Sequence, residues 1–454
     1  MKKNDTVRLE ITSVSSDGNG VGRYEGMAVF VPKTAAGDII LCRIVKVCKR
    51  YAFGIIDSIV TPSASRTDSR HCDVFGKCGG CVYRHMDYSA EAAAKEKIVR
   101  DAFLHIGKLD VPFDETIPCD NTEHYRNKAQ YPLSYENGKV VCGFYAARSH
   151  RVIPCIDCSL QPGVFSQIAA DICKFLTDNK SSVYNEETGK GTVRHIYLRR
   201  GHYSGEIMVC IVVTYPCAKK FGGLCSLLTE KYRDIKSIVL NINPERTNVI
   251  LGEKCVTLWG SDKISDIMCG NKIFISPLSF YQVNTPQAEK IYAKAAEYAG
   301  LTGSETVLDL YCGAGTVGLS LASRAEKIIG CEIVPQAVDN ARENAAANGI
   351  LNAEFFCGDA GDIARELGRK NIRPDVIITD PPRKGCGEKT LSEMVRMAPQ
   401  RIVMISCNPA TAAKDTVFLS DNGFFAEKVS AVDLFPGTGL VECVVLMSRI
   451  SGNG

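Results

Sequence analysis

The chain has 454 residues, of which 45% are hydrophobic and 23% charged, and its formal net charge is +3. This length suffices for two or three domains with separate cores, and the composition is that of an ordinary globular protein. No apolar run approaches the roughly 20 residues that cross a bilayer, and the polar start lacks the apolar stretch of a signal peptide. These features exclude a membrane protein, and we expect a cytoplasmic, monomeric one.

The positions of charged residues, cysteines and histidines along the chain each limit the possible functions. Basic residues outnumber acidic ones before residue 270 and are outnumbered after it, so a polyanion would meet the first part of the chain. The 21 cysteines are scattered, which in an intracellular protein favours free thiols, metal ligands or catalysis over a disulfide framework. All seven histidines lie at or before His202, so any base in the C-terminal region must be a carboxylate, lysine or tyrosine.

Residues 1–62 show short alternating apolar and polar stretches separated by glycine-bearing turns. The stretches include Val7–Ile11, Ala28–Val31 and Ile39–Ile44. This pattern predicts a small antiparallel barrel of about five strands, similar to the OB architecture that commonly binds oligonucleotides. Residues 61–65 (Thr-Pro-Ser-Ala-Ser) indicate a linker that follows the barrel.

Residues 63–270 are expected to form a central domain of mixed helices and strands. A helix is predicted near Ser89–His105. The expected strands of this region lie near residues 139–145, 193–199, 207–214 and 237–242.

A cysteine-bearing loop opens this region and predicts a metal centre. Cys72, Cys78 and Cys81 lie on it with five and two residues between them, and the intervening glycines let all three thiols face one centre. Cys158 is the expected fourth ligand, and Cys155 is close enough to compete with it. Four cysteine thiolates can hold either zinc or a [4Fe–4S] cluster, and the spacing leaves both open.

From Lys272 onward, short β-branched runs alternate with helical stretches. This periodicity predicts an α/β domain over residues 271–454, with a doubly wound, Rossmann-like sheet. The expected strands are Thr306–Leu310, Lys327–Cys331, Glu354–Cys357, Val376–Thr379, Ile402–Ser406 and Val441–Met447, and Pro335–Asn348 is an expected helix.

The segment Asp309–Gly318 predicts a strand, a glycine-rich turn and the start of a helix, because glycine lets the backbone approach a ligand closely. Glu332 ends the next strand, where it can hold a pair of ribose hydroxyls, and Asp359 follows the strand after that, where it can meet an adenine. No phosphate-binding lysine accompanies the turn. The set favours S-adenosylmethionine over NAD and predicts a methyltransferase domain.

Two further motifs follow predicted strands of this domain. Asp380-Pro381-Pro382-Arg383 places a carboxylate and a rigid turn beside the donor, and Arg383 stands where amino-directed methyltransferases usually have an aromatic residue. Cys407 lies in Ser-Cys-Asn-Pro at the end of the next strand, and Glu442 lies on a later one. The carboxyl edge of an open α/β sheet is where ligands bind.

Methylation of uracil C5 explains why a cysteine and a carboxylate occur together. Uracil C5 is a poor nucleophile, but a thiolate that adds to C6 creates an enolate with carbanion character at C5. A base must then remove the C5 proton before the thiolate can leave. The simpler interpretations make Cys407 a buried thiol and Glu442 a surface or capping carboxylate, and the neighbouring motifs favour the catalytic ones.

With these motifs the chain resembles the RNA 5-methyluridine (uracil-C5) methyltransferases over nearly its whole length, and the bacterial 23S rRNA branch in particular. Gly20–Arg23 and Val29–Pro32 resemble a TRAM domain, and Ser279–Asn284 resembles the segment that opens the catalytic domain. Leu440 is a departure, because the family often has histidine two residues before the catalytic glutamate.

The resemblance implies a role for each matching residue. Cys407 would be the nucleophile and Glu442 the base. The residues implied to line the donor and base pocket are Gln282, Tyr311, Thr316, Glu332, Asp359 and Asp380, with S-adenosyl-L-methionine as the donor. The residues implied to hold a [4Fe–4S] cluster are Cys72, Cys78, Cys81 and Cys158. Phe280 and Tyr281 are candidate stacking platforms for a splayed-out uridine.

The expected function is therefore methylation of a uridine C5 in RNA, with 23S rRNA as the favoured substrate. Three alternatives stay open. The same chemistry could act on tRNA, or the enzyme could methylate cytosine C5, which also uses a cysteine adduct. A non-catalytic RNA-binding maturation factor with the same fold is the third alternative.

Overall fold

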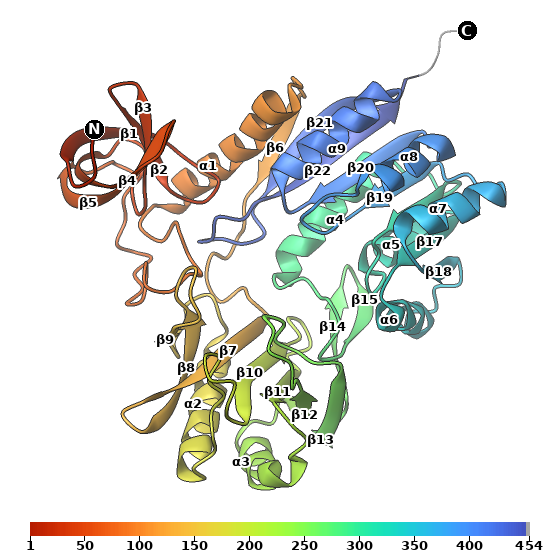
Figure 1. Cartoon of the computed structure of the whole chain (residues 1–454). Coiled ribbons are helices and arrows are strands. Elements are labelled where there is room, and N and C mark those ends of the chain that lie inside the picture. Colours follow the sequence, from red (N-terminus) through yellow and green to blue (C-terminus); the bar gives the residue numbers. More distant parts are fainter. Residues whose placement is uncertain (451–454) are drawn as a thin grey trace.

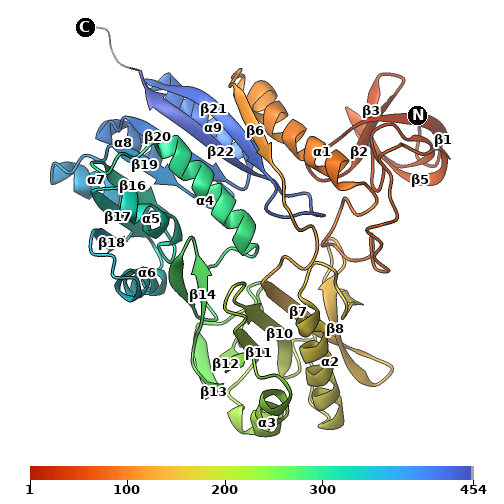
Figure 2. The ribbon, with the colours of Figure 1, turned by 180° about the vertical axis from the view of Figure 1, so that it is seen from behind.

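The structure is a computed structural model that describes residues 1–450. It contains an N-terminal barrel, a central sheet covered by two helices, and a C-terminal sheet with helices on both faces (Figures 1 and 2). The predicted α/β fold with an N-terminal barrel is confirmed. None of the helices formed by residues 1–450 is both long and apolar enough to cross a membrane.

The N-terminal barrel is closed and has five strands in the order β1-β2-β3-β5-β4. Its strands are β1 (Thr6–Val14), β2 (Gly20–Tyr24), β3 (Met27–Val31), β4 (Ile39–Val47) and β5 (Tyr51–Thr61). Alternate residues point inward, so that Val7, Leu9 and Ile11 of β1 are buried while the residues between them are exposed. This is the two-residue periodicity on which the sequence prediction depends.

The central sheet has seven strands in the order β13-β12-β11-β10-β7-β8-β9. Its strands are β7 (Lys128–Glu136), β8 (Lys139–Tyr145), β9 (Val152–Pro154), β10 (Val193–Arg200), β11 (Ile207–Val213), β12 (Ile235–Ile242) and β13 (Lys254–Gly260). The four strands expected in this region correspond to β8, β10, β11 and β12, with ends within two residues of the expected ones. Helices α2 (Gly163–Asp178) and α3 (Gly222–Lys231) cover one face of the sheet.

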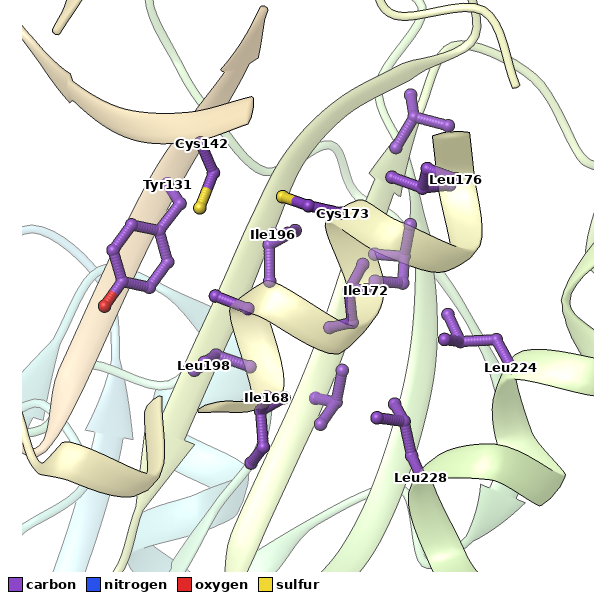
Figure 3. Packing of buried hydrophobic residues seen from close by; sticks show 14 of the residues in the cluster. Tyr131, Cys142, Ile168, Ile172, Cys173, Leu176, Ile196, Leu198, Leu224 and Leu228 are labelled. Carbon is purple, nitrogen blue, oxygen red and sulfur yellow. The ribbon is translucent and has the colours of Figure 1, made fainter. Parts of the chain in front are cut away.

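The core of this domain lies between the central sheet and its two helices (Figure 3). Ile168 and Ile172 of α2 and Leu224 of α3 are fully buried against Ile196 and Leu198 of β10. Burial of each such side chain contributes about 1.5–3 kcal/mol. A hairpin of β14 (Ile264–Met268) and β15 (Asn271–Ile275) then leads to the C-terminal sheet.

The C-terminal sheet has eight strands in the order β18-β17-β16-β19-β20-β22-β21-β6. Its strands are β16 (Thr306–Leu310), β17 (Lys327–Glu332), β18 (Ala353–Cys357), β19 (Val376–Thr379), β20 (Arg401–Ser406), β21 (Phe424–Val432), β22 (Glu442–Arg449) and β6 (Phe113–Ile117). The strands from β18 to β20 are parallel, and β22 runs antiparallel between β20 and β21. Each of the six strands expected in this domain is present.

Helices cover both faces of the C-terminal sheet, as expected for a doubly wound domain. One face is packed by α4 (Thr285–Ala299) and α5 (Thr316–Leu321), and α6 (Pro335–Ala347) lies beside them near β17 and β18. The other face is packed by α7 (Ala360–Arg369), α8 (Glu388–Met397) and α9 (Pro409–Asp421).

Two elements that precede the central sheet in the chain pack with the C-terminal sheet instead. Helix α1 (Tyr88–Asp101), capped by the Asp87 carboxylate, continues into a π-helical segment (Ala102–Gly107) that contacts α9. Strand β6 pairs in parallel with β21 at the edge of the sheet. The range expected to form a central domain thus supplies one helix and one strand to the C-terminal sheet, a long-range pairing that local sequence patterns do not encode.

Candidate active site

A cavity of about 630 Å³ lies at the carboxyl ends of the parallel strands of the C-terminal sheet. This is the edge at which open α/β sheets bind ligands. The structure brings together here the eight residues predicted to bind the donor or to catalyse the reaction: Gln282, Tyr311, Thr316, Glu332, Asp359, Asp380, Cys407 and Glu442. The four predicted cluster cysteines line a separate cavity.

The glycine-rich turn after β16 forms one wall of the active-site cavity. Gly313 and Gly315 have φ values of 55° and 80°, in the left-handed region that glycine adopts most easily. The Gly313 N–H donates to one oxygen of the Glu332 carboxylate (3.2 Å), and the Val334 N–H donates to the other (2.9 Å). These bonds hold an acidic side chain at the end of β17, in the position predicted from the sequence.

Two hydroxyl groups that line the active-site cavity form hydrogen bonds within the protein. The Tyr311 hydroxyl donates to the Cys386 carbonyl (3.0 Å), and the Thr316 hydroxyl pairs with the Tyr292 hydroxyl (3.1 Å). The backbone carbonyl of Gln282 accepts a hydrogen bond from the Asn127 side chain (2.8 Å), which ties the segment before α4 to the central domain. These hydrogen bonds therefore fix the part of the cavity wall formed by Gln282, Tyr311 and Thr316.

Asp359 serves the fold as well as the cavity. Its carboxylate caps α7 by accepting from the Asp362 N–H (3.2 Å) and also accepts from the Lys389 ammonium (3.0 Å). The Lys389 ammonium holds the pKa of the Asp359 carboxyl below its ordinary value. Asp359 therefore stays ionised at neutral pH and presents an acceptor to the cavity.

Cys407 follows β20 directly, in a turn that Asn408 fixes. The Asn408 side chain accepts from the Ala410 N–H (3.2 Å) as the cap of α9, and it donates to the Arg383 carbonyl (3.1 Å). Pro409 occupies the first turn of α9, where its missing N–H leaves no partner unsatisfied. The Ser-Cys-Asn-Pro motif thus places a thiol in the cavity and joins it to the turn that contains Asp380.

Besides Glu332 and Asp359, three carboxyl groups lie in or behind the cavity wall, and burial raises the pKa of each of these three. The pKa is raised to about 7 for Asp309 and Asp380. Burial, with a further contribution from the Asp380 charge, raises the pKa of Glu442 to about 8. Near neutral pH, Glu442 is therefore mostly protonated and Asp309 and Asp380 are partly protonated, and a cationic ligand among them would favour their ionised forms.

The pKa of the Cys407 thiol is raised because the thiol is partly buried and because the ionised forms of Glu442 and Asp380 disfavour a thiolate beside them. The Arg383 guanidinium opposes this effect on both Cys407 and Glu442. Arg383 also lines the cavity, so the residue that distinguishes this motif from the amino-directed methyltransferases shares the cavity with Cys407 and Glu442.

Some lining residues were not singled out in the sequence. Tyr292 belongs to the buried stripe of α4, and Phe435 lies in the connection between β21 and β22. Neither has a local pattern that separates it from an ordinary core aromatic. Of the two candidate stacking platforms, Phe280 is 64% exposed, whereas Tyr281 is buried and its hydroxyl donates to Asp266.

The predicted cluster cysteines gather around a second cavity of about 240 Å³ between the cysteine loop and the central sheet. Five thiols line it: Cys72, Cys78, Cys81, Cys155 and Cys158. Within residues 1–450, no three Cys, His, Asp or Glu side chains converge closely enough to hold a single metal ion. Thiols spread around a cavity suit a multi-atom cluster better than one zinc ion.

The polar groups beside this second cavity also fit an anionic group. Arg84, Arg126 and Lys128 line it, and Arg84 is buried with one guanidinium nitrogen that has no hydrogen-bond partner. The Gly80 N–H donates to the Cys78 sulfur (3.3 Å), as expected for a thiolate ligand. The donor set and its surroundings are thus compatible with an all-cysteine iron–sulfur cluster.

Comparison with known families gives two matches. Residues 272–450 match the model for "tRNA (Uracil-5-)-methyltransferase", and residues 2–56 match the model for the TRAM domain. The first range contains all eight predicted residues of the active-site cavity, and the second corresponds to the closed barrel.

Similar proteins span nearly the whole chain. An uncharacterized RNA methyltransferase of Clostridium tetani is 41% identical over 448 residues, which are 99% of this chain and 97% of that protein. One of Bacillus cereus is 40% identical over 451 residues, with 99% and 98% covered. Among solved structures, the tRNA (uracil-54, C5)-methyltransferase of Pyrococcus abyssi in complex with S-adenosyl-L-homocysteine has a TM-score of 0.77 at 26% identity, with 97% of this chain and 99% of that chain covered.

Proposed function

The chain belongs to the RNA (uracil-5-)-methyltransferase family, and from this premise we propose that it methylates a uridine C5 through a covalent adduct between Cys407 and uracil C6. The observation that carries the proposal is that one cavity is lined by the donor loop, the Cys407 thiol and the Glu442 carboxyl. S-adenosyl-L-methionine is the methyl donor. A non-catalytic maturation factor would have no need to keep these three features together.

The reaction is balanced with the groups of this cavity. The Cys407 thiolate adds to C6, and the C5–C6 π electrons move onto the uracil O4. C5 then takes the methyl group, and S-adenosylhomocysteine leaves. Glu442 removes the C5 proton, the C5=C6 bond re-forms, and the C6–S bond breaks to release the thiolate. The proton therefore ends on Glu442, and no histidine is needed.

The raised pKa values suit a site that receives a sulfonium cation. The positive charge of the donor favours the ionised forms of Asp380 and Glu442, so that the base is deprotonated when the donor is bound. Donor binding should therefore release protons near pH 7.

Donor affinity should consequently increase with pH. We expect the dissociation constant of S-adenosylmethionine to fall roughly tenfold between pH 6 and pH 8.5, because a unit shift of pKa corresponds to a tenfold change. Isothermal titration calorimetry in buffers of different ionisation enthalpy measures both the affinity and the released protons. S-adenosylhomocysteine, an uncharged thioether, is the matched control and should show a much weaker dependence. An equal pH dependence for both ligands would contradict this account.

The RNA substrate is proposed to be 23S rRNA, from the resemblance of the barrel and the cysteine loop to that branch. The second candidate is tRNA, favoured by the likeness of the whole chain to the Pyrococcus abyssi enzyme, whose substrate is uridine 54 of tRNA. Mapping of 5-methyluridine in rRNA and tRNA from a strain without this protein distinguishes the two. Nucleoside analysis after incubation with labelled donor tests the base, since 5-methylcytidine would contradict the uridine assignment.

We also propose that Cys72, Cys78, Cys81 and Cys158 hold a [4Fe–4S] cluster. When bound, the cluster would cross-link the cysteine loop to the segment beside β9, and methyl transfer through a thiolate adduct moves no net electrons. The Gly79 N–H already donates to the Tyr145 carbonyl (3.0 Å), so the loop is docked on β8 by its backbone. The role assigned to the cluster is thus structural.

Loss of one cluster ligand should remove iron and loosen this loop. In Cys81→Ser we expect loss of most bound iron and sulfide and of the visible absorption, with faster hydrogen exchange in residues 72–83. Cys158→Ser and Cys155→Ser, compared side by side, decide which of the two is the fourth ligand. Cys173→Ser, which changes a buried cysteine of α2 outside the cavity, is the control. A protein that keeps its full iron content without Cys81 would refute the ligand set.

A further inference from the structure

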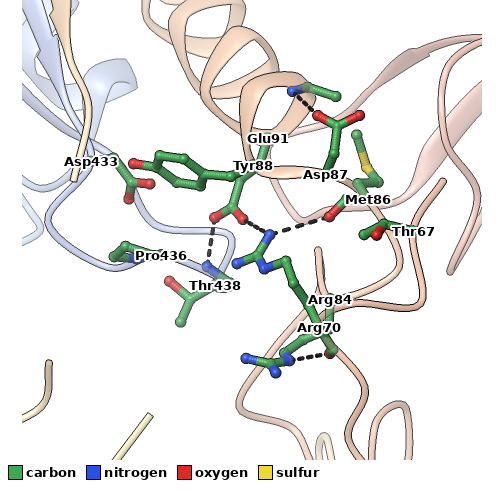
Figure 4. Close-up of polar contacts among 12 residues, drawn as sticks. Thr67, Arg70, Arg84, Met86, Asp87, Tyr88, Glu91, Asp433, Pro436 and Thr438 are labelled. Carbon is green, nitrogen blue, oxygen red and sulfur yellow. Dashed lines mark hydrogen bonds and ion pairs between the residues drawn. The ribbon is translucent and has the colours of Figure 1, made fainter. Parts of the chain in front are cut away.

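A buried network of charged side chains joins α1 to the connection between β21 and β22, which we call the base loop (residues 433–441) because it leads directly to Glu442 (Figure 4). The network consists of Arg70, Glu91, Lys95 and Asp433. All four side chains are nine-tenths or more buried, with exposed fractions of 6%, 0%, 1% and 1%. Two positive and two negative charges balance within it.

Glu91 is the centre of the network. One carboxylate oxygen accepts from Arg70 (2.6 Å), and the other accepts from Lys95 (2.7 Å) and from the Gly437 backbone N–H (2.5 Å). Gly437 has a φ of 83°, which favours glycine, and a Cβ there would lie 3.6 Å from the Arg70 guanidinium. A charge on α1 therefore holds the middle of the base loop by its backbone.

Lys95 holds the start of the same loop. Its ammonium donates to the Asp433 carboxylate (2.7 Å) and to the Phe435 carbonyl (3.1 Å), in addition to Glu91. All three of its N–H donors are thus used, which is the arrangement that a buried ammonium requires. The Asp433 carboxylate in turn accepts from the Phe435 N–H (3.2 Å).

Other elements hold three more carbonyl groups of the base loop. The Leu434 carbonyl accepts from Asn284 (3.1 Å), and the Pro436 carbonyl accepts from the Tyr125 hydroxyl (3.0 Å). The Gly437 carbonyl accepts from the backbone N–H groups of Val82 (2.8 Å) and Tyr83 (3.1 Å), which follow Cys81 directly. The loop is thus fixed at four successive carbonyls, from Leu434 to Gly437.

Glu442 itself depends on this support. Within residues 1–450, no group donates a hydrogen bond to the Glu442 carboxyl. Its pKa is set by burial and by the charges of Asp380 and Arg383. Its place in the cavity is therefore set by its backbone at the first position of β22. Phe435 and Leu440 of the base loop line the same cavity.

We propose that Glu91 and Lys95 are positioning residues for Glu442: they hold the base loop so that the carboxyl faces C5 of the methylated adduct. The proposal rests on the proposed function, in which Glu442 removes the C5 proton. A buried charge network contributes less stability than apolar packing of the same volume, so its presence here is better explained by the geometry that it imposes. None of the four residues lines the active-site cavity.

The proposal predicts a defect in one half of the reaction. Cys407 follows β20 and the glycine-rich turn follows β16, and none of the hydrogen bonds or ion pairs of the network involves these strands, so adduct formation and methyl transfer should proceed in its absence. Proton removal should slow, because a small displacement of a catalytic group costs up to roughly 100-fold in rate. The methylated protein–RNA adduct should therefore accumulate.

The experiment uses the full chain and 5′-labelled, unmodified transcripts of 23S rRNA and tRNA, with adduct scored on denaturing gels. In Lys95→Met we expect at least a tenfold higher adduct fraction at steady state, at least a tenfold lower turnover, and unchanged affinity for S-adenosylhomocysteine. Lys97→Met removes the same charge from an exposed position of α1 and should behave as wild type. The double variant Glu91→Gln/Lys95→Met restores charge balance and should still accumulate adduct, because the loop has lost both hydrogen bonds from Lys95 and the charged acceptor of the Gly437 N–H.

Tyr125→Phe removes a single hydroxyl contact with the base loop and keeps the proposal testable if the charge variants do not fold. It should raise the adduct fraction by a smaller factor. Equal losses of adduct, donor affinity and turnover in these variants would reduce the network to a general structural role and overturn the proposal. If Glu442→Gln traps adduct and Lys95→Met does not, this inference alone fails. If Glu442→Gln traps none, the proposed function fails.

Discussion

Replacing Cys407 by alanine is expected to abolish methylation of RNA and the covalent protein–RNA adduct. Turnover should fall at least ~10³-fold, as it does when the nucleophile of a covalent mechanism is removed. Without the thiolate, nothing activates C5, since the carboxyl groups of the cavity cannot raise the electron density of the ring. Donor binding should persist, because the donor wall is formed by β16, β17 and the turns that follow them.

Cys386→Ala provides a matched control for this variant. Cys386 is a buried cysteine that lines the same cavity, on the turn after Asp380, and it has no role in the proposed reaction. It should keep most of the activity. Transfer of label from the donor to RNA measures turnover, and denaturing gels with 5-fluorouridine-substituted RNA, in which C5 carries no removable proton, measure adduct formation. Substantial turnover by the Cys407→Ala protein would remove the covalent mechanism.

Local sequence patterns were sufficient to predict the strands and turns that surround the active-site cavity. β16 and β19 have the predicted ends, because short β-branched runs bounded by glycine or proline turns specify buried parallel strands. The same turns put Glu332, Asp380 and Cys407 at one sheet edge, so topology alone brings distant motifs together. Gln282 does not follow from this rule, because it lies just before α4 and was predicted only from the resemblance to the family.

The support behind the base could not be predicted in this way. Lys95 and Asp433 are 338 residues apart, and a lysine on α1 has the same sequence signature whether it is exposed, like Lys97, or buried in an ion pair. The pairing of β6 with β21 has the same character. Contacts of this kind depend on which distant segments of the chain pack together in the folded protein, and no local periodicity encodes them.

The pH dependence of stability should identify the buried acids of the cavity. Glu442 has a pKa of about 8 in the folded protein and an ordinary value near 4.5 in the unfolded chain. Between these values the folded protein binds more protons, so the free energy of unfolding should fall as pH rises from about 5 to 8. Asp380 and Asp309 act in the same direction. Thermal melts in the absence of donor measure this slope, which Glu442→Gln should reduce.

Glu442→Gln is expected to separate the two halves of the reaction most sharply. The glutamine keeps the shape of the side chain but cannot accept the C5 proton, so each enzyme molecule should methylate one uridine and remain attached to it. We expect a burst of methyl transfer of about one equivalent, followed by turnover at least ~10²-fold below wild type, the usual contribution of a general base. Digestion of the trapped complex with nuclease and protease should release a peptide that contains Cys407 linked to a methylated nucleotide.

The pH profile supplies an independent test of the same residue. Release of product by the wild-type enzyme should rise with pH until Glu442 is ionised, because the sulfonium charge is gone once the methyl group has been transferred and Glu442 keeps its raised pKa of about 8. The slow product release by the Glu442→Gln variant should not show this increase with pH. Glu354→Gln, which changes an exposed carboxylate on β18 paired with Lys327, should retain the wild-type profile. A glutamine variant that turns over at the normal rate would assign proton removal to another group, and the candidate is Asp380, which lines the same cavity and whose charge acts on Glu442.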